Sequence, residues 1–196
     1  MTANEYHLTS KWRVLGTVDE VFGLVSRDEE LARWWPAAFL DVMTLEPGDA
    51  KGLGKVVRME TRGWLPYRLH WHLRVDEMAA PHRFGFAVWG DFEGRGAWSF
   101  EPDGAWTDVG FEWQVRVQKP LVRYVSVLAR PLFISNHRWA MARGEESLRL
   151  ELTRRQATDP ELRCELAPPP LAPSYGGVAL GAAAGALVGL MLLRRR

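Results

Sequence analysis

Cysteine is nearly absent from this chain of 196 residues, and an apolar stretch is missing from its N-terminus, MTANEYHLTSKW. The one cysteine, Cys164, excludes an intrachain disulfide framework and a zinc site built from several cysteines, and it favours a reducing compartment. The polar N-terminus predicts no secretory signal. Acidic residues are missing after Glu165, whereas three of the 25 basic residues are the terminal arginines 194–196. The preceding part therefore has more acidic than basic residues, which argues against a nucleic-acid-binding domain.

The chain is rich in tryptophan, with ten residues of this type, and 47% of all residues are hydrophobic. Such a composition supports a packed core and excludes general disorder. The length suits one domain with an appended segment. We assign residues 1–158 to a globular domain, 159–175 to a Pro-rich linker, 176–193 to a transmembrane helix and 194–196 to a basic tail.

Residues 176–193 form an uncharged, apolar run that follows the Pro-rich stretch APPPLAPSY. As a helix this run would be roughly 27 Å long, close to the thickness of the hydrocarbon core of a bilayer. We interpret it as a single-pass C-terminal membrane anchor, with the globular domain in the cytoplasm. The alternatives are a buried helix and an unstructured tail.

Glycines recur every fourth residue in this run, at Gly177, Gly181, Gly185 and Gly189. On a helix they would form one stripe, and such a stripe lets two helix backbones approach closely in lipid. Self-association of the anchor is therefore one hypothesis. The alternative is that these glycines only fill a weakly constrained anchor.

Hydrophobic periodicity predicts the elements of the globular domain. Residues 5–15 alternate as a half-buried strand, and capping boxes at 17–20 and 26–29 predict two short helices, the second ended by Pro36. Alternating stretches then predict a series of strands, at 39–45, 55–61, 67–75, 83–89, 95–100 and 106–117. A helical period follows to about Gln156, and Pro131 is expected to kink or interrupt that helix.

This order predicts an α+β fold in which a curved antiparallel sheet of about seven strands surrounds a long C-terminal helix. A twisted sheet and a straight helix cannot touch everywhere, so an apolar cavity is expected between them. Gly144 on the inward stripe of the helix would leave a notch for a bulky side chain from the sheet. The inward positions of strands and helix predict the lining of the cavity, namely Trp12, Met59, Leu69, Trp71, Phe111, Trp113, Phe133, His137 and Met141.

Several short motifs accompany this order of elements. They are Trp34-Trp35-Pro36, the Glu46-Pro-Gly48 turn, the stretch from Lys55 to Gly63, and Asn136-His137-Arg138-Trp139-Ala-Met141 with Gly144-Glu145. With them, residues 4–155 resemble START-like proteins of the polyketide cyclase/dehydrase superfamily. The resemblance implies the helix-grip fold of the birch pollen allergen and lipid-transfer domains. It also implies binding of a lipid, quinone, polyketide or other hydrophobic molecule, and it supplies no set of cyclase residues.

His137 is the main candidate for chemistry, because it lies on the inward stripe of the late helix. It would act as a proton donor or as a polar contact for a ligand, and the alternative is a core histidine with a structural role. Asn136 and Arg138 are expected to face elsewhere. No metal site or cofactor is predicted, because His70 and His72 fall on the outer face of their strand.

Two further groups have open interpretations. Asp108 and Glu112 lie opposite the apolar side of their strand, so paired carboxylate catalysis is disfavoured. The aromatic residues near the second short helix would either gate the cavity, dip into a membrane surface or pack in the core, and they are Trp34, Trp35, Phe39 and Trp64.

Three functions remain in competition. The first is a membrane-anchored domain that binds a hydrophobic small molecule. The second is a cyclase, aromatase or dehydratase acting on a polyketide-like substrate, with His137, Thr61 and Tyr6 as the polar candidates. The third is a membrane-anchored module for protein interaction or stress.

Overall fold

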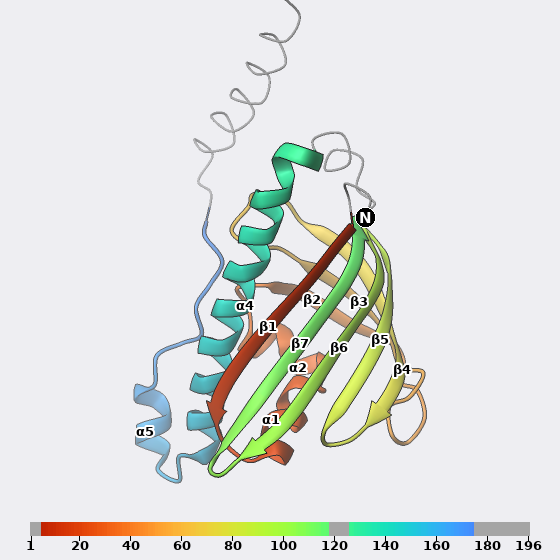
Figure 1. Cartoon of the computed structure of the whole chain (residues 1–196). Helices are drawn as coiled ribbons and strands as arrows, with labels where there is room; N and C mark the ends of the chain where they lie inside the picture. Colours follow the sequence, from red (N-terminus) through yellow and green to blue (C-terminus); the bar gives the residue numbers. More distant parts are fainter. Residues whose placement is uncertain (1–4, 118–125, 175–196) are drawn as a thin grey trace, which may run out of the picture.

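The computed structural model describes residues 5–117 and 126–174 (Figure 1). A strand and two short helices open the chain, followed by six strands, a long helix and a short one. The elements are β1 Glu5–Leu15, α1 Val18–Val25, α2 Asp28–Trp34, β2 Phe39–Glu46, β3 Val56–Thr61, β4 Leu69–Ala79, β5 Arg83–Gly90, β6 Phe92–Asp103, β7 Trp106–Val117, α4 Ser126–Gln156 and α5 Pro160–Glu165.

The seven strands form one antiparallel sheet in the order β1-β7-β6-β5-β4-β3-β2. On β7, odd-numbered residues from Thr107 to Val117 are buried, and the even-numbered ones between them are exposed or half-buried. This period of two gives the sheet one apolar face. Figure 1 shows the curved sheet with α4 along that face and α1 and α2 at one end. The predicted α+β helix-grip architecture is confirmed.

The capping box predicted at the start of α1 is present, whereas the one predicted at the start of α2 is not. The Thr17 hydroxyl accepts a hydrogen bond from the Glu20 amide at 3.3 Å, and the Glu20 carboxylate accepts one from the Thr17 amide at 2.8 Å, which completes a capping box. The predicted second box at 26–29 is wrong, since α2 has Arg27 as its N-cap and no side-chain cap. Asp28, at the start of α2, instead bonds across to Lys55 and Thr44.

Helix α4 runs from Ser126 to Gln156 with Pro131 inside it, so the helix is not interrupted there, and a kink at Pro131 stays a prediction. Pro131 lies in the second turn, where the missing N–H removes one intrahelical hydrogen bond. Buried side chains farther along, at Phe133, Met141, Leu148 and Leu152, hold the rest of the helix against the core. The inward stripe of the helix was therefore predicted correctly.

Gly144 provides the closest approach between α4 and the segment after α2. A Cβ atom added to Gly144 would lie 2.3 Å from Cζ2 of Trp35, so the indole ring occupies the space that any other residue would fill. Trp35 is buried and packs against Trp12 and Phe39, with ring centroids 5.5 and 5.0 Å apart. The predicted notch exists, but its occupant comes from the end of α2 and not from the sheet.

A charged contact joins the same two helices. Arg33 of α2 donates two hydrogen bonds to the Glu151 carboxylate of α4, at 2.8 and 3.1 Å. Burial raises the pKa of Glu151, but the hydrogen bonds from Arg33 and Arg155 outweigh this and bring the pKa down to about 2. The buried carboxylate is therefore ionised at neutral pH and fixes α2 against α4.

Part of the predicted linker is structured. Residues 160–165 form α5, and the following extended segment returns alongside α4 (Figure 1). Arg154 of α4 donates to the Ala167 carbonyl at 3.0 Å, and Arg62 donates to the Ala172 carbonyl at 3.4 Å. We call residues 166–174 the C-terminal strap. Within residues 5–117 and 126–174, no helix has the length and apolarity needed to cross a bilayer. Residues 176–193, with the glycine stripe, lie outside the described residues.

We expect Gly144→Ala to lower the free energy of unfolding by about 1–3 kcal/mol, because the new methyl group displaces a buried indole ring. Gly23→Ala in α1 is the matched control. A Cβ there meets nothing within 4 Å, and alanine is the better helix former, so stability should rise by up to about 1 kcal/mol. Chemical denaturation measures both changes. A Gly144→Ala protein as stable as the Gly23→Ala protein would contradict the tight contact with Trp35.

Candidate functional site

A cavity of about 160 Å³ lies between the inner face of the sheet, α4 and the α1–α2 segment. This volume is close to that of an apolar cavity of about 150 Å³ that holds benzene. The lining is mostly apolar and aromatic, and it includes Leu31, Trp35, Phe39, Val57, Met59, Leu69, Trp71, Leu73, Phe84, Phe86, Phe92, Trp98, Phe111, Trp113, Phe133, Ala140 and Met141.

Eight of the nine side chains predicted to line a cavity do so. They are Met59, Leu69, Trp71, Phe111, Trp113, Phe133, His137 and Met141. Trp12 is buried but lies outside the lining, because its ring packs between Trp35 and Trp98 at centroid distances of 5.5 and 5.1 Å. Trp12 lies on the edge strand β1, which packs against α4, and its neighbour Trp35 lines the cavity in its place. Ligand contact by the other eight stays a prediction.

The aromatic wall of the cavity is held in fixed orientations. Trp71 and Trp113 meet edge to face at 5.6 Å, and Phe111 stacks on Trp113 at 5.7 Å. The indole N–H of Trp71 donates to the Thr61 hydroxyl at 2.9 Å. This bond satisfies the polar atom of Trp71, so its ring presents carbon to the cavity.

His137 lies in the lining on α4, with its ring stacked on Phe111 at 6.1 Å. Burial lowers the pKa of His137 to about 4, and the nearby charge of Arg138 adds to the effect. The imidazole is therefore neutral at pH 7. Its Nε2 atom is buried and has no hydrogen-bond partner among the described residues. Such an atom can hydrogen-bond to a guest molecule or to water.

Asn136 also lines the cavity, although the sequence predicted that it faces elsewhere. Its side-chain oxygen accepts a hydrogen bond from the Leu65 amide at 3.1 Å. A Cβ on Gly63 would lie 2.1 Å from the same oxygen, so the loop between β3 and β4 rests directly on α4. Asn136 thus ties this loop to the helix at one end of the cavity.

Sequence reasoning missed a buried ion pair in the lining. Asp28 at the start of α2 pairs with Lys55, and its other oxygen accepts a hydrogen bond from Thr44 at 2.7 Å. The Lys55 ammonium also donates to the Ser26 carbonyl at 3.3 Å. One signal was present, because Lys55 continues the inward alternation of Val57, Met59 and Thr61. Asp28, which lies 27 residues earlier in the chain, carried no signal in the sequence that it would pair with Lys55.

Most of the remaining candidates lie away from the cavity. His70 is exposed, and His72 stacks on Trp89 at 5.3 Å, while Asp108 and Glu112 are exposed as predicted. Trp34 is buried in the core and Trp64 is half-buried, and neither lines the cavity. Trp35 and Phe39 are the two members of that aromatic group that do.

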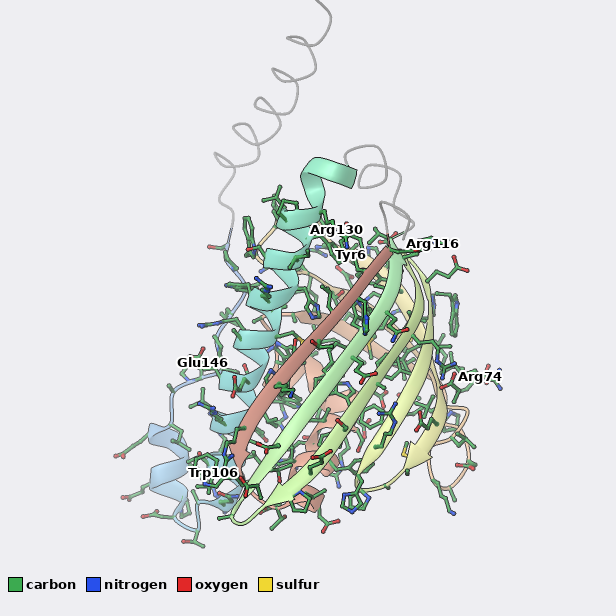
Figure 2. The ribbon with its side chains drawn as sticks, viewed as in Figure 1. Tyr6, Arg74, Trp106, Arg116, Arg130 and Glu146 are labelled. Atoms are coloured by element: carbon green, nitrogen blue, oxygen red, sulfur yellow. The ribbon has the colours of Figure 1, made fainter. Side chains whose placement is uncertain are left out.

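Tyr6, a polar candidate for catalysis, also lies outside this cavity. The Arg130 guanidinium covers its ring at 5.1 Å, and Figure 2 shows the two side chains together at one end of β1 and α4. Burial raises the pKa of Tyr6, while the charge of Arg130 opposes the rise. Of the three polar candidates, Thr61 and His137 therefore line the cavity and Tyr6 does not.

Comparison with known families agrees with this geometry. Residues 7–152 match the family described as polyketide cyclase / dehydrase and lipid transport. The match covers the sheet and most of α4, which together enclose the cavity. The chain belongs to this family. No curated protein sequence matches it significantly.

Solved structures share the fold at low sequence identity. An aromatase/cyclase, Zhui, from Streptomyces sp. R1128 aligns over 79% of this chain and 97% of its own, with a TM-score of 0.64 and 17% identity. A protein from Thermus thermophilus aligns over 78% and 100%, with a TM-score of 0.62 and 15% identity. A START superfamily protein from Mycobacterium smegmatis aligns over 76% and 99%, with a TM-score of 0.58 and 17% identity.

We expect His137 to make folding sensitive to acid. The unfolded imidazole has a pKa near 6.5 and the folded one about 4, so the unfolded state binds more protons between these values. Stability should therefore fall as the pH drops from 6.5 to 4, by about 1–3 kcal/mol from this residue. His137→Leu should remove this loss.

Denaturant unfolding at pH 7, 5.5 and 4.5 measures this loss of stability. The first pH lies above both pKa values of His137, and the other two lie between them. His70→Leu removes an imidazole from the exposed face of β4 and is the control. It should keep the acid loss. Equal pH profiles for wild type and His137→Leu would show that His137 is not buried as described.

Proposed function

We propose that this protein binds a hydrophobic small molecule in the cavity between its sheet and α4. The observation that supports this most is the apolar hollow of about 160 Å³, walled by aromatic rings held by their neighbours. Burying apolar ligand surface there contributes roughly 25 cal/mol per Å² without any catalytic group. In this conformation the hollow suits a molecule, or the part of a lipid, quinone or polyketide, about the size of one aromatic ring.

A membrane setting is part of the proposal. The uncharged run 176–193 follows the C-terminal strap after one residue, Tyr175, and the strap is tied at Ala172 to Arg62, which lines the cavity. An anchor leaving the domain near Arg62 would keep the cavity beside the bilayer, where a poorly water-soluble ligand is concentrated.

A second candidate is an enzyme of the cyclase, aromatase or dehydratase type. It is favoured by two polar side chains in the lining, His137 with its unpaired Nε2 and Thr61. Ligand binding leads because the pKa of about 4 makes His137 a weak base, and no carboxylate is hydrogen-bonded to it among the described residues.

Filling the cavity should weaken binding. We expect Met59→Trp to weaken binding of α-methylstyrene, an aromatic hydrocarbon, at least about 10-fold, because the indole ring takes the space of the guest. Met43→Trp on the exposed face of the edge strand β2 is the matched control and should leave affinity unchanged. Calorimetry or ligand-detected NMR with the full chain gives the affinities. The proposal fails if wild type does not bind the probe, or if both variants bind it equally well.

The membrane part has its own test. We expect the full chain to stay with membranes through an alkaline carbonate wash, and Ala183→Arg with Leu187→Arg to release it. Each arginine near the centre of a spanning helix costs about 2.5–3.5 kcal/mol on insertion. Leu171→Arg on the exposed part of the strap is the control and should remain bound. Release of the wild-type chain by the wash would contradict the anchor.

A further inference from the structure

The inward row of side chains formed by β3 and the preceding residue Lys55 is polar at both ends and apolar between them. Lys55, Val57, Met59 and Thr61 alternate toward the cavity, and all four line it. The first and last of these are six residues apart, which is about 20 Å along a strand. At the Thr61 end the loop that follows β3 contacts Asn136, and at the Lys55 end lies the ion pair with Asp28. A ring-sized molecule at either end of this row therefore meets a polar group.

Several hydrogen-bond donors of the lining have no partner among the described residues, whereas the side-chain oxygens of Asp28, Thr61 and Asn136 each already accept a bond. The Lys55 ammonium has three N–H bonds, and two of them are directed to Asp28 and Ser26. The third has no partner among the described residues.

Two other donors in the lining are unpaired. The Nε1–H of Trp35 and the Nε–H of Arg62 are buried and have no hydrogen-bond partner within the described part of the chain. Neither group can act as an acceptor. A purely hydrocarbon guest would leave all of these donors unsatisfied, whereas a guest with an acceptor oxygen can satisfy one of them.

We propose that Lys55, held by Asp28 and Ser26, forms a subsite for the oxygen of a neutral carbonyl group on an otherwise apolar, ring-sized ligand. The class of ligand is an aromatic ketone or quinone. This inference rests on the proposed function, because the ring must first occupy the cavity. The third N–H of Lys55 donates to the carbonyl oxygen, and the aromatic wall contacts the ring.

The charge balance of the subsite favours a neutral oxygen over an anionic one. Asp28 and Lys55 are mostly buried, with side-chain exposures of 6% and 18%, and their charges cancel. A carboxylate ligand would bring an uncompensated negative charge into this end of the cavity, which is costly. A ketone accepts the hydrogen bond and adds no charge.

Two probes of nearly equal shape separate this subsite from the apolar cavity. Acetophenone carries a carbonyl oxygen where α-methylstyrene carries a CH₂ group. The variant is Asp28→Asn with Lys55→Met, which removes the ammonium without leaving its carboxylate partner charged and buried. The control is Asp41→Asn with Arg58→Met, which removes an exposed ion pair from the outer face of β2 and β3.

We expect the Asp28→Asn, Lys55→Met variant to bind acetophenone about 10-fold or more weakly than wild type, since a hydrogen bond to a charged donor is lost. Its affinity for α-methylstyrene should change by less than about threefold, because the apolar contacts remain. The control variant should match wild type for both probes. Benzoate should bind wild type more weakly than acetophenone does.

The outcomes distinguish the carbonyl subsite at Lys55 from the binding of an apolar molecule in the cavity. Equal weakening of both probes, or none, in the Asp28→Asn, Lys55→Met variant overturns the carbonyl subsite and leaves the apolar cavity standing. Failure of wild type to bind either probe contradicts the proposed function and, with it, the subsite.

A measurement on wild type covers the case in which the variant does not fold. The carbonyl stretching band of bound, isotope-labelled acetophenone should lie below its frequency in cyclohexane, because a hydrogen bond from an ammonium weakens the C=O bond. A band at the hydrocarbon frequency would overturn the proposal.

Discussion

The contact between Trp35 and Gly144 determines how closely the helices and sheet approach one another. The indole ring lies against bare backbone at the one position of α4 that lacks a side chain, and the Arg33–Glu151 bonds hold the same two helices together. With α4 fixed at Gly144, the cavity lies along the preceding part of the helix, from Phe133 to Met141. A twisted sheet cannot contact a helix along its whole length, which leaves room for this hollow.

The chemistry of the cavity follows from strand alternation. Inward positions on β3, β4 and β7 supply carbon-rich side chains, and their polar atoms are satisfied locally, as the Trp71–Thr61 bond shows. Polar groups of the lining include Lys55 with Asp28 before β3 begins and Thr61 where β3 ends, and His137 lies against Phe111 of β7. An apolar middle with polar ends fits a guest that is mostly hydrocarbon and carries oxygen at its edge.

Periodicity predicted what depends on neighbours in sequence. The strands, the long helix and eight cavity residues follow from alternation and the helical stripe, because burial repeats with the backbone. Contacts between distant segments could not be read this way. Trp12 is covered by Trp35, Asn136 contacts the β3–β4 loop, and Asp28 pairs with Lys55 where a capping box of residues 26–29 had been expected. Each depends on how separate elements pack, which a single sequence does not encode locally.

The most direct test of the account is a crystal structure of the full chain under xenon pressure, since xenon enters dry apolar cavities. The account predicts a xenon atom between β3 and α4, within contact distance of Met59, Trp71 and Met141. A cavity filled by side chains or ordered water, with xenon bound only at the surface, would contradict it.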